Sequence, residues 1–68
     1  MLQLPQKERF LRLTDVIDRT GLSRSSIYQS ISEGKFPPSV NLGARSVGWL
    51  ESEIDAWMQD RINERVKM

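Results

Sequence analysis

The pattern of polar and apolar positions is most informative between Thr14 and Ile31, where it predicts two short helices joined by a turn. In the first helix Thr14 is expected to act as the cap, and Asp15 complements the positive end of the helix dipole. Gly21 ends that helix, and Ser23 caps the start of the next. This order of stop, turn and start signals predicts a helix-turn-helix.

The second helix, over residues 23–33, has two different faces. Ile27 and Ile31 lie one turn apart on one side, whereas Ser25 and Gln29 point to the other. Gly34 supplies a left-handed stop after the helix. A polar outer face on the second helix of such a motif indicates a reader of the DNA major groove.

Residues 39–50 alternate with a period of two, which is typical of strands. Val40 and Leu42 fall on one side of the first strand, and Val47 and Trp49 fall on one side of the second. Residues 43–45 connect the two strands. The segment is therefore expected to form a short antiparallel hairpin, a wing in a helix-turn-helix setting. A further short strand is expected within residues 10–13.

The last helix is expected to begin near Glu51 or Ser52, because acids suit the first turn of a helix. Its apolar face consists of Leu50, Ile54, Trp57, Met58 and Ile62. Phe36 is expected to fill the core beneath the second helix. Both tryptophans fall on the apolar side of their elements, which favours core packing over base stacking.

These elements predict a mainly helical α+β fold, a small winged helix-turn-helix with three helices and a two- or three-stranded β wing. Residues 1–9 are expected to form a flexible N-terminal arm, and residues 10–66 a single DNA-binding domain. At 68 residues the chain is one small domain with little apolar surface to bury.

Composition argues against catalysis. The chain has no cysteine, so it has no thiolate. It also has no histidine, the commonest metal ligand and the commonest general base. We therefore expect no catalytic residues, no metal, no cofactor and no small-molecule ligand. No apolar run approaches the ~18 residues of a membrane span, and the N-terminus lacks the plan of a signal peptide. We expect a cytoplasmic protein, associated with the nucleoid when bound to DNA.

The net charge is only +1, but the charges are segregated along the chain. Between Gly21 and Gly48 there are three basic residues and one acid, whereas acids gather in the last third. This distribution favours double-stranded DNA as partner. The expected DNA-binding residues are Ser23, Arg24, Ser25, Ser26, Tyr28, Gln29, Ser32, Lys35, Arg45 and Ser46.

Within this set the expected roles differ. Helix 23–33 reads the major groove, where Gln29 can form a bidentate pair with adenine. The wing tip, residues 43–46, contacts the backbone or the adjacent minor groove through Arg45. Tyr28 packs its ring and offers its hydroxyl to a phosphate. For Lys35, a solvated charge is as good an explanation as a phosphate contact.

Four motifs in order carry a resemblance to a known family: G-L-S-R-S-S-I-Y at residues 21–28, E-G-K-F-P at 33–37, L-G-A-R-S-V-G-W at 42–49 and E-I-D-A-W at 53–57. The chain resembles the AlpA family of phage and prophage transcriptional regulators over about residues 11–62. The resemblance implies a winged-helix domain related to excisionase and MerR-type DNA-binding domains, and regulation of prophage genes. Position 29, often basic in that family, is glutamine here.

Alternative functions remain open from the sequence. An excisionase-like factor that bends DNA would use the same fold. A protein-interaction module such as an anti-repressor would use it to bind a partner protein. One domain covers only roughly 600–1,000 Å² of DNA, so self-association on DNA as a dimer or a cooperative array is expected. The operator, the sign of regulation, the oligomeric state and the controlling signal do not follow from the residues.

Overall fold

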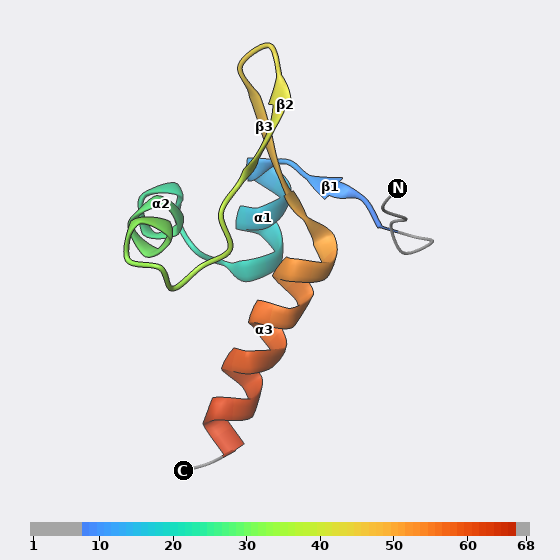
Figure 1. Cartoon of the computed structure of the whole chain (residues 1–68). Helices are drawn as coiled ribbons and strands as arrows, with labels where there is room; N and C mark the ends of the chain where they lie inside the picture. The colour runs from blue at the N-terminus through green and yellow to red at the C-terminus, as the bar shows by residue number, and fades with distance from the viewer. Residues whose placement is uncertain (1–7, 67–68) are drawn as a thin grey trace.

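The computed structural model describes residues 8–66 and has the predicted α+β architecture, three helices with a three-stranded sheet (Figure 1). In chain order the elements are β1 (Phe10–Leu11), α1 (Leu13–Thr20), α2 (Arg24–Ser32), β2 (Val40–Gly43), β3 (Ser46–Leu50) and α3 (Glu51–Val66). The β2–β3 hairpin projects from the helices as a wing, and α3 extends away from it (Figure 1). Residues 1–7 of the expected arm lie outside the described residues.

The sheet is antiparallel, with strand order β1-β3-β2. Leu11 pairs with Trp49, and Val40 pairs with Gly48. The third strand is the two-residue β1, so the short strand expected within residues 10–13 is confirmed and ends before Arg12. β1 fixes the base of the wing to the chain segment that enters α1.

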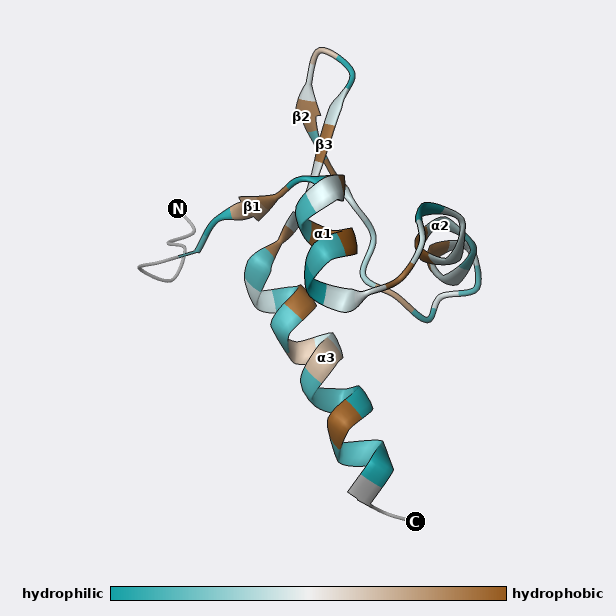
Figure 2. Ribbon diagram, turned by 180° about the vertical axis from the view of Figure 1, so that it is seen from behind, coloured by the Kyte–Doolittle hydropathy of each residue, from teal (hydrophilic) through white to brown (hydrophobic). Residues whose placement is uncertain are grey.

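Six side chains form the buried core: every element except β2 supplies one, and the sixth comes from the loop between α2 and β2. They are Leu11, Val16, Ile27, Phe36, Trp49 and Ile54. Each of the three helices contributes apolar residues to this centre, and the other helical positions are largely hydrophilic (Figure 2). The expected core positions of Phe36 and Trp49 are confirmed, whereas Trp57 is only partly buried.

The residues that stop and start the helices of the helix-turn-helix are largely those predicted. Gly21, at φ 75°, closes α1, and its N–H donates to the Ile17 carbonyl. The Ser23 hydroxyl accepts from the Ser26 N–H at 3.1 Å and caps α2. Gly34 adopts the predicted left-handed conformation at φ 73°.

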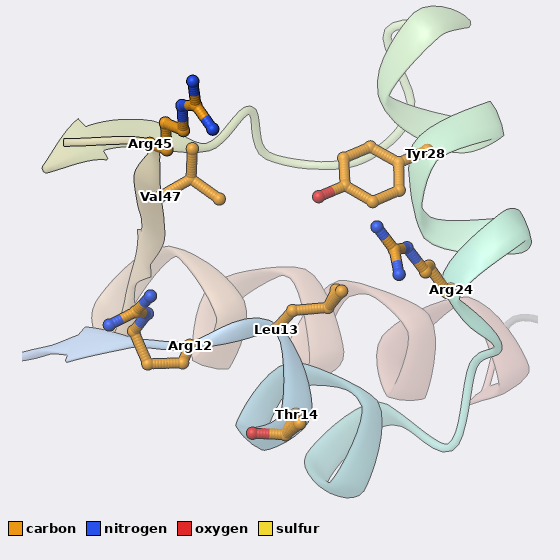
Figure 3. Close-up of a pocket in the computed structure, with 7 residues that line it drawn as sticks. All are labelled: Arg12, Leu13, Thr14, Arg24, Tyr28, Arg45 and Val47. Carbon is orange, nitrogen blue, oxygen red and sulfur yellow. The ribbon is translucent and has the colours of Figure 1, made fainter. Parts of the chain in front are cut away.

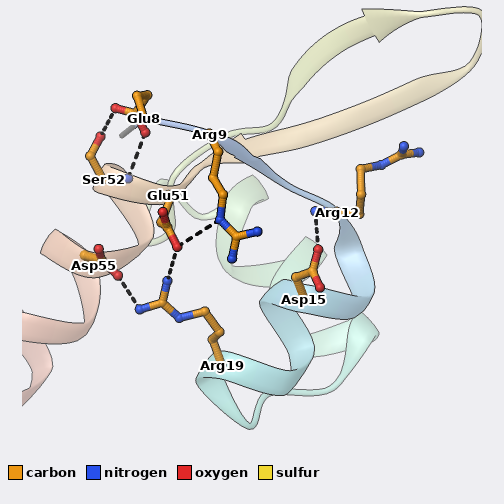
Figure 4. Close-up of polar contacts among 8 residues, drawn as sticks. All are labelled: Glu8, Arg9, Arg12, Asp15, Arg19, Glu51, Ser52 and Asp55. Atoms are coloured by element: carbon orange, nitrogen blue, oxygen red, sulfur yellow. Dashed lines mark hydrogen bonds and ion pairs between the residues drawn. The ribbon is translucent and has the colours of Figure 1, made fainter. Parts of the chain in front are cut away.

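The predicted cap of α1 is wrong. The helix begins at Leu13, so the N-cap position is Arg12 and Thr14 lies inside the first turn. The Asp15 carboxylate accepts from the Arg12 N–H at 3.1 Å, which satisfies an amide at the helix start (Figure 4). The capping group is therefore Asp15, for which the sequence predicts only a favourable interaction with the helix dipole.

The wing also differs from the expected pattern. Val40 pairs with Gly48, so it faces away from Trp49, and Leu42 also lies against Gly48 on that outer face. Val40 and Leu42 are each 37% exposed. Alternation alone could not identify the buried side, because both faces of this hairpin carry apolar residues. In α3, Ile62 is likewise exposed, so the apolar stripe of that helix continues beyond the core.

Polar contacts connect the chain before β1 to the start of α3 (Figure 4). The Glu8 carboxylate accepts from the Ser52 N–H at 3.1 Å and from its hydroxyl at 2.7 Å, and these bonds lower the pKa of Glu8. Arg9 and Arg19 both contact Glu51, at 3.2 and 3.1 Å. Residues 8 and 9 therefore help to hold α3 in place.

Candidate nucleic-acid interface

Helix α2 presents a polar face to solvent. Ile27 is fully buried and Ile31 half-buried, which orients the helix on the core. The predicted contact residues on its other sides are exposed: Ser23, Arg24, Ser25, Ser26, Tyr28, Gln29 and Ser32. The helix-turn-helix thus has the amphipathic orientation that the sequence predicted.

Some of these polar groups have partners within the chain. The Gln29 side-chain amide donates to Glu33 at 3.2 Å, and the Ser32 hydroxyl donates to the Gln29 carbonyl at 2.7 Å. The hydroxyl of Ser23 donates to that of Ser26 at 3.0 Å. Ser25 forms no side-chain hydrogen bond within residues 8–66, which leaves its hydroxyl free for an external partner.

A cleft of about 500 Å³ lies between α2, the wing and the start of α1 (Figure 3). Leu13 and Val47 form apolar parts of its wall. Figure 3 shows the Tyr28 hydroxyl and the Arg24 guanidinium directed from α2 into the space toward the wing. The lining is completed by Arg12, Thr14 and Arg45.

Three arginines from three separate parts of the chain line this cleft. Arg12 precedes α1, Arg24 opens α2 and Arg45 lies in the wing turn. No ion pair joins any of these guanidinium groups to a carboxylate among the described residues, whereas Arg9, Arg19 and Arg61 each have an acidic partner. Guanidinium groups stay charged at any physiological pH, so the cleft is a concave site of concentrated positive charge.

The wing turn holds Arg45 in an unusual conformation. Ala44 and Arg45 have φ values of 46° and 66°, and neither is glycine. Positive φ at both central residues matches the right-handed twist of a tight hairpin. The backbone strain at Arg45 is the cost of keeping the hairpin short with an arginine at its tip.

The structure brings only some of the predicted site residues together. Arg24, Tyr28 and Arg45 meet at the cleft. Lys35 lies after α2, outside the cleft, and pairs with Glu33 at 3.8 Å. Ser46 is half-buried at the start of β3.

Sequence reasoning missed Arg12. The sequence pattern places residue 12 in a short strand, which does not indicate that its side chain lies beside the wing. Figure 4 shows the Arg12 guanidinium pointing away from Asp15, which binds only its backbone N–H. No local signal marks this residue, because only the pairing of β1 with β3 brings Arg12 to the base of the wing.

The family described as "Prophage CP4-57 regulatory protein (AlpA)" matches residues 9–62. The chain belongs to the AlpA family. This match covers both the arginine cleft and α2, so the parts expected to contact DNA lie within the segment that defines the family.

Two relatives of this chain, one from a phage and one from a bacterium, are similar over most of its length. "Uncharacterized protein ORF88" of Enterobacteria phage P4 is 51% identical over 67 residues, covering 96% of this chain and 76% of the relative. "DNA-binding transcriptional activator AlpA" of Escherichia coli (strain K12) is 42% identical over 59 residues, covering 78% of this chain and 84% of the relative. The resemblance inferred from the four motifs is confirmed.

Two properties of residues 8–66 bear on other functions. None of the helices there combines the length and the apolar character that a membrane crossing requires. The same residues include no group of three or more acidic, histidine or cysteine side chains placed to hold a metal ion.

Proposed function

We propose that this AlpA family protein is a sequence-specific transcriptional regulator that binds double-stranded DNA. Helix α2 enters the major groove, and the wing tip contacts the backbone or the adjacent minor groove. The observation that carries the proposal is the cleft lined by Arg12, Arg24 and Arg45, whose guanidinium groups have no described carboxylate partner. The relative from E. coli, named as a DNA-binding transcriptional activator, supports the same class of function.

The proposed interface divides into two kinds of contact. The arginines of the cleft bind phosphates and fix the orientation of the domain, which carries no sequence information by itself. Gln29 and Ser25, exposed on α2, face base edges and supply sequence choice. The hydroxyl of Tyr28 adds a neutral donor between the helix and the wing.

The test begins with selection of bound sequences from a random duplex pool, followed by affinity measurements across a salt series. Neutralisation of three phosphates by the cleft arginines gives a slope of log affinity against log salt of about −2.7, and further contacts extend it to about −4.5. A defined motif and a slope in this range are the expected results. Failure to retain any duplex at low salt would contradict the proposal.

A matched pair of variants tests the cleft itself. Arg24→Ala removes a guanidinium that lines the cleft, whereas Arg65→Ala removes an exposed one near the end of α3. We expect the first to weaken DNA binding by about 1–3 kcal/mol and the second to change it little. Equal losses would show that general positive charge, rather than this cleft, governs binding.

We also propose that the protein acts as a dimer or a cooperative array, because one domain of this size makes a small interface. Regular half-site spacing in the selected motif is the expected sign. The same duplexes distinguish an excisionase-like role, which would appear as DNA bending and stimulated excision without an effect on transcription. An anti-repressor would instead form a stable protein complex and retain no DNA. The proposed setting is the cytoplasm, at the nucleoid.

A further inference from the structure

A second groove, of about 320 Å³, lies between α3 and the loop that leads to β2. It shares no residue with the arginine cleft. Positions 53, 56, 57 and 60 recur at i, i+3, i+4 and i+7, so they form one face of α3. The lining residues are Pro37, Pro38, Glu53, Ala56, Trp57 and Asp60.

The walls of this groove are fixed by contacts within the chain. The Trp57 Nε1–H donates to the Lys35 carbonyl at 2.9 Å, and the Trp57 ring meets Phe36 edge-on with centroids 4.9 Å apart. The Trp49 Nε1–H donates to the Pro37 carbonyl at 3.0 Å. Because two tryptophans hold the loop, a ligand would meet a preformed surface and would not have to order it.

The floor of the groove is apolar and its two ends are acidic. Ala56 and Trp57 lie on the helix between Glu53 and Asp60, which are about 10 Å apart along the axis. Within residues 8–66, neither carboxylate has an ion pair or a side-chain hydrogen bond. Among the acids of residues 8–66, only Asp18 also lacks an ion pair and a side-chain hydrogen bond. Two of the three acids without such partners therefore line one groove.

The charge of this groove decides its ligand class. Carboxylates repel DNA phosphates and anionic lipid headgroups, so nucleic acid and membrane are poor ligands here. The aliphatic parts of lysine and arginine pack well on apolar floors while their charged ends reach nearby acids. Within the chain, a guanidinium already packs against this tryptophan: the Arg61 group lies 5.5 Å from the Trp57 ring centroid.

Arg61 does not neutralise the groove. Its guanidinium pairs with Glu64 at 2.7 Å, one turn further along α3. Glu53 and Asp60 therefore keep their charges available for an external cation. We propose that this groove binds a basic, partly apolar segment of another protein, with lysine or arginine side chains beside these two carboxylates. The inference goes beyond DNA binding and does not depend on it.

The experiment is an NMR titration of the ¹⁵N-labelled full chain with a short synthetic peptide of alternating leucine and lysine. We expect chemical-shift changes at the Trp57 indole N–H and the Ala56 amide. In the Glu53→Gln/Asp60→Asn variant the affinity should fall by about fivefold to tenfold, the size expected for two partly exposed ion pairs. A peptide with glutamate in place of lysine should not bind.

Asp18→Asn is the matched control, because Asp18 is an exposed acid on α1 outside the groove. It should leave the peptide affinity unchanged. Equal affinity of the lysine peptide for the original chain and the double variant would overturn the proposal. So would shifts confined to α2 or the wing, or equal binding of the glutamate peptide.

DNA binding by the same variants separates this inference from the proposed function. The double variant and Asp18→Asn should have DNA affinities within about twofold of the original chain, because distant exposed charges are strongly screened. A chain that binds the peptide in the groove but retains no duplex would contradict the proposed function alone. A chain that binds duplex DNA but not the peptide would overturn the groove proposal alone.

Discussion

The ring of Tyr28 meets the ring of Trp49 edge-on, with centroids 6.3 Å apart and planes inclined by 61°. Trp49 is fully buried in β3, whereas Tyr28 is 40% exposed on α2. The contact connects the helix proposed to read DNA with the strand that carries the wing. The hydroxyl of the same tyrosine faces the arginine cleft (Figure 3).

Tyr28→Phe separates these two roles. The variant keeps the aromatic pair and loses one hydroxyl, so its melting temperature should stay close to that of the original chain. Its DNA affinity should fall about threefold to tenfold, the size of one net hydrogen bond to a phosphate. Tyr28→Leu is the companion variant, and it should also lower the stability by about 1 kcal/mol through loss of the ring pair. Unchanged DNA affinity in Tyr28→Phe would mean that the hydroxyl contacts nothing in the complex.

Arg45 and Gln29 should affect binding in different ways. Arg45→Ala should weaken binding to selected and random duplexes alike and reduce the salt slope by about 0.9, because one phosphate contact is lost. Gln29→Ala should remove about 1–3 kcal/mol of discrimination at one base pair and leave the salt slope unchanged. Competition binding on both kinds of duplex across a salt series measures the two effects. Parallel losses on both duplexes in both variants would refute this division.

Gly48 is required by the close approach of three strands. A Cβ atom there would lie 3.0 Å from Leu42 Cδ1, 3.2 Å from the Leu11 carbonyl oxygen and 3.2 Å from Phe10 Cβ. The Leu42 side chain can move, but the Leu11 carbonyl belongs to the backbone of β1. Gly48→Ala should therefore destabilise the fold by about 1–3 kcal/mol, measurable by thermal unfolding. An equally stable variant would show that β1 can withdraw from β3 at little cost.

At Ala44 a substitution should stabilise the fold, because its φ of 46° disfavours alanine. Asparagine tolerates the left-handed conformation better and is common in two-residue hairpin turns. Ala44→Asn should stabilise the domain by about 0.5–1 kcal/mol while Arg45 stays in place. The β-branched Ala44→Val should lower the melting temperature. Loss of stability in both variants would indicate that the turn relaxes away from positive φ in solution.

The hydrogen bonds between Glu8 and Ser52 should make stability depend on pH. They lower the pKa of Glu8 in the folded chain, so the carboxylate favours folding above the unfolded pKa, about 4.3 for a free glutamate. This contribution is lost as the pH falls through the lower, folded pKa. Glu8→Gln should thus melt below the original chain at neutral pH, and the two should converge in acid. A difference in melting temperature that is the same at both pH values would contradict this account.

Local signals predicted most of the fold. Gly21, Ser23 and Gly34 act at the backbone positions that they occupy, so their effects follow from the nearest neighbours alone. The outward face of Val40 and Leu42 was not predictable in that way. It depends on the pairing register, which the two-residue turn and the irregularity between Asn41 and Gly43 set together.

The candidate site was predicted only where one helix or one turn carries it. Arg24 and Tyr28 share α2, and Arg45 lies at the wing tip, so each could be named from its own element. Arg12 joins them only because β1 pairs with β3 and brings the start of α1 to the base of the wing. That placement is a long-range property, and no pattern within residues 8–13 encodes it.

Helix α2 is nine residues long, and Ile27 is its only fully buried side chain. A helix of this length has little stability of its own in water. Its position therefore depends on a few tertiary contacts, chiefly the burial of Ile27 and the contact of Tyr28 with Trp49. If α2 enters the groove as proposed, we expect so weakly anchored a helix to adjust to small differences in groove width between duplexes more readily than the wing does.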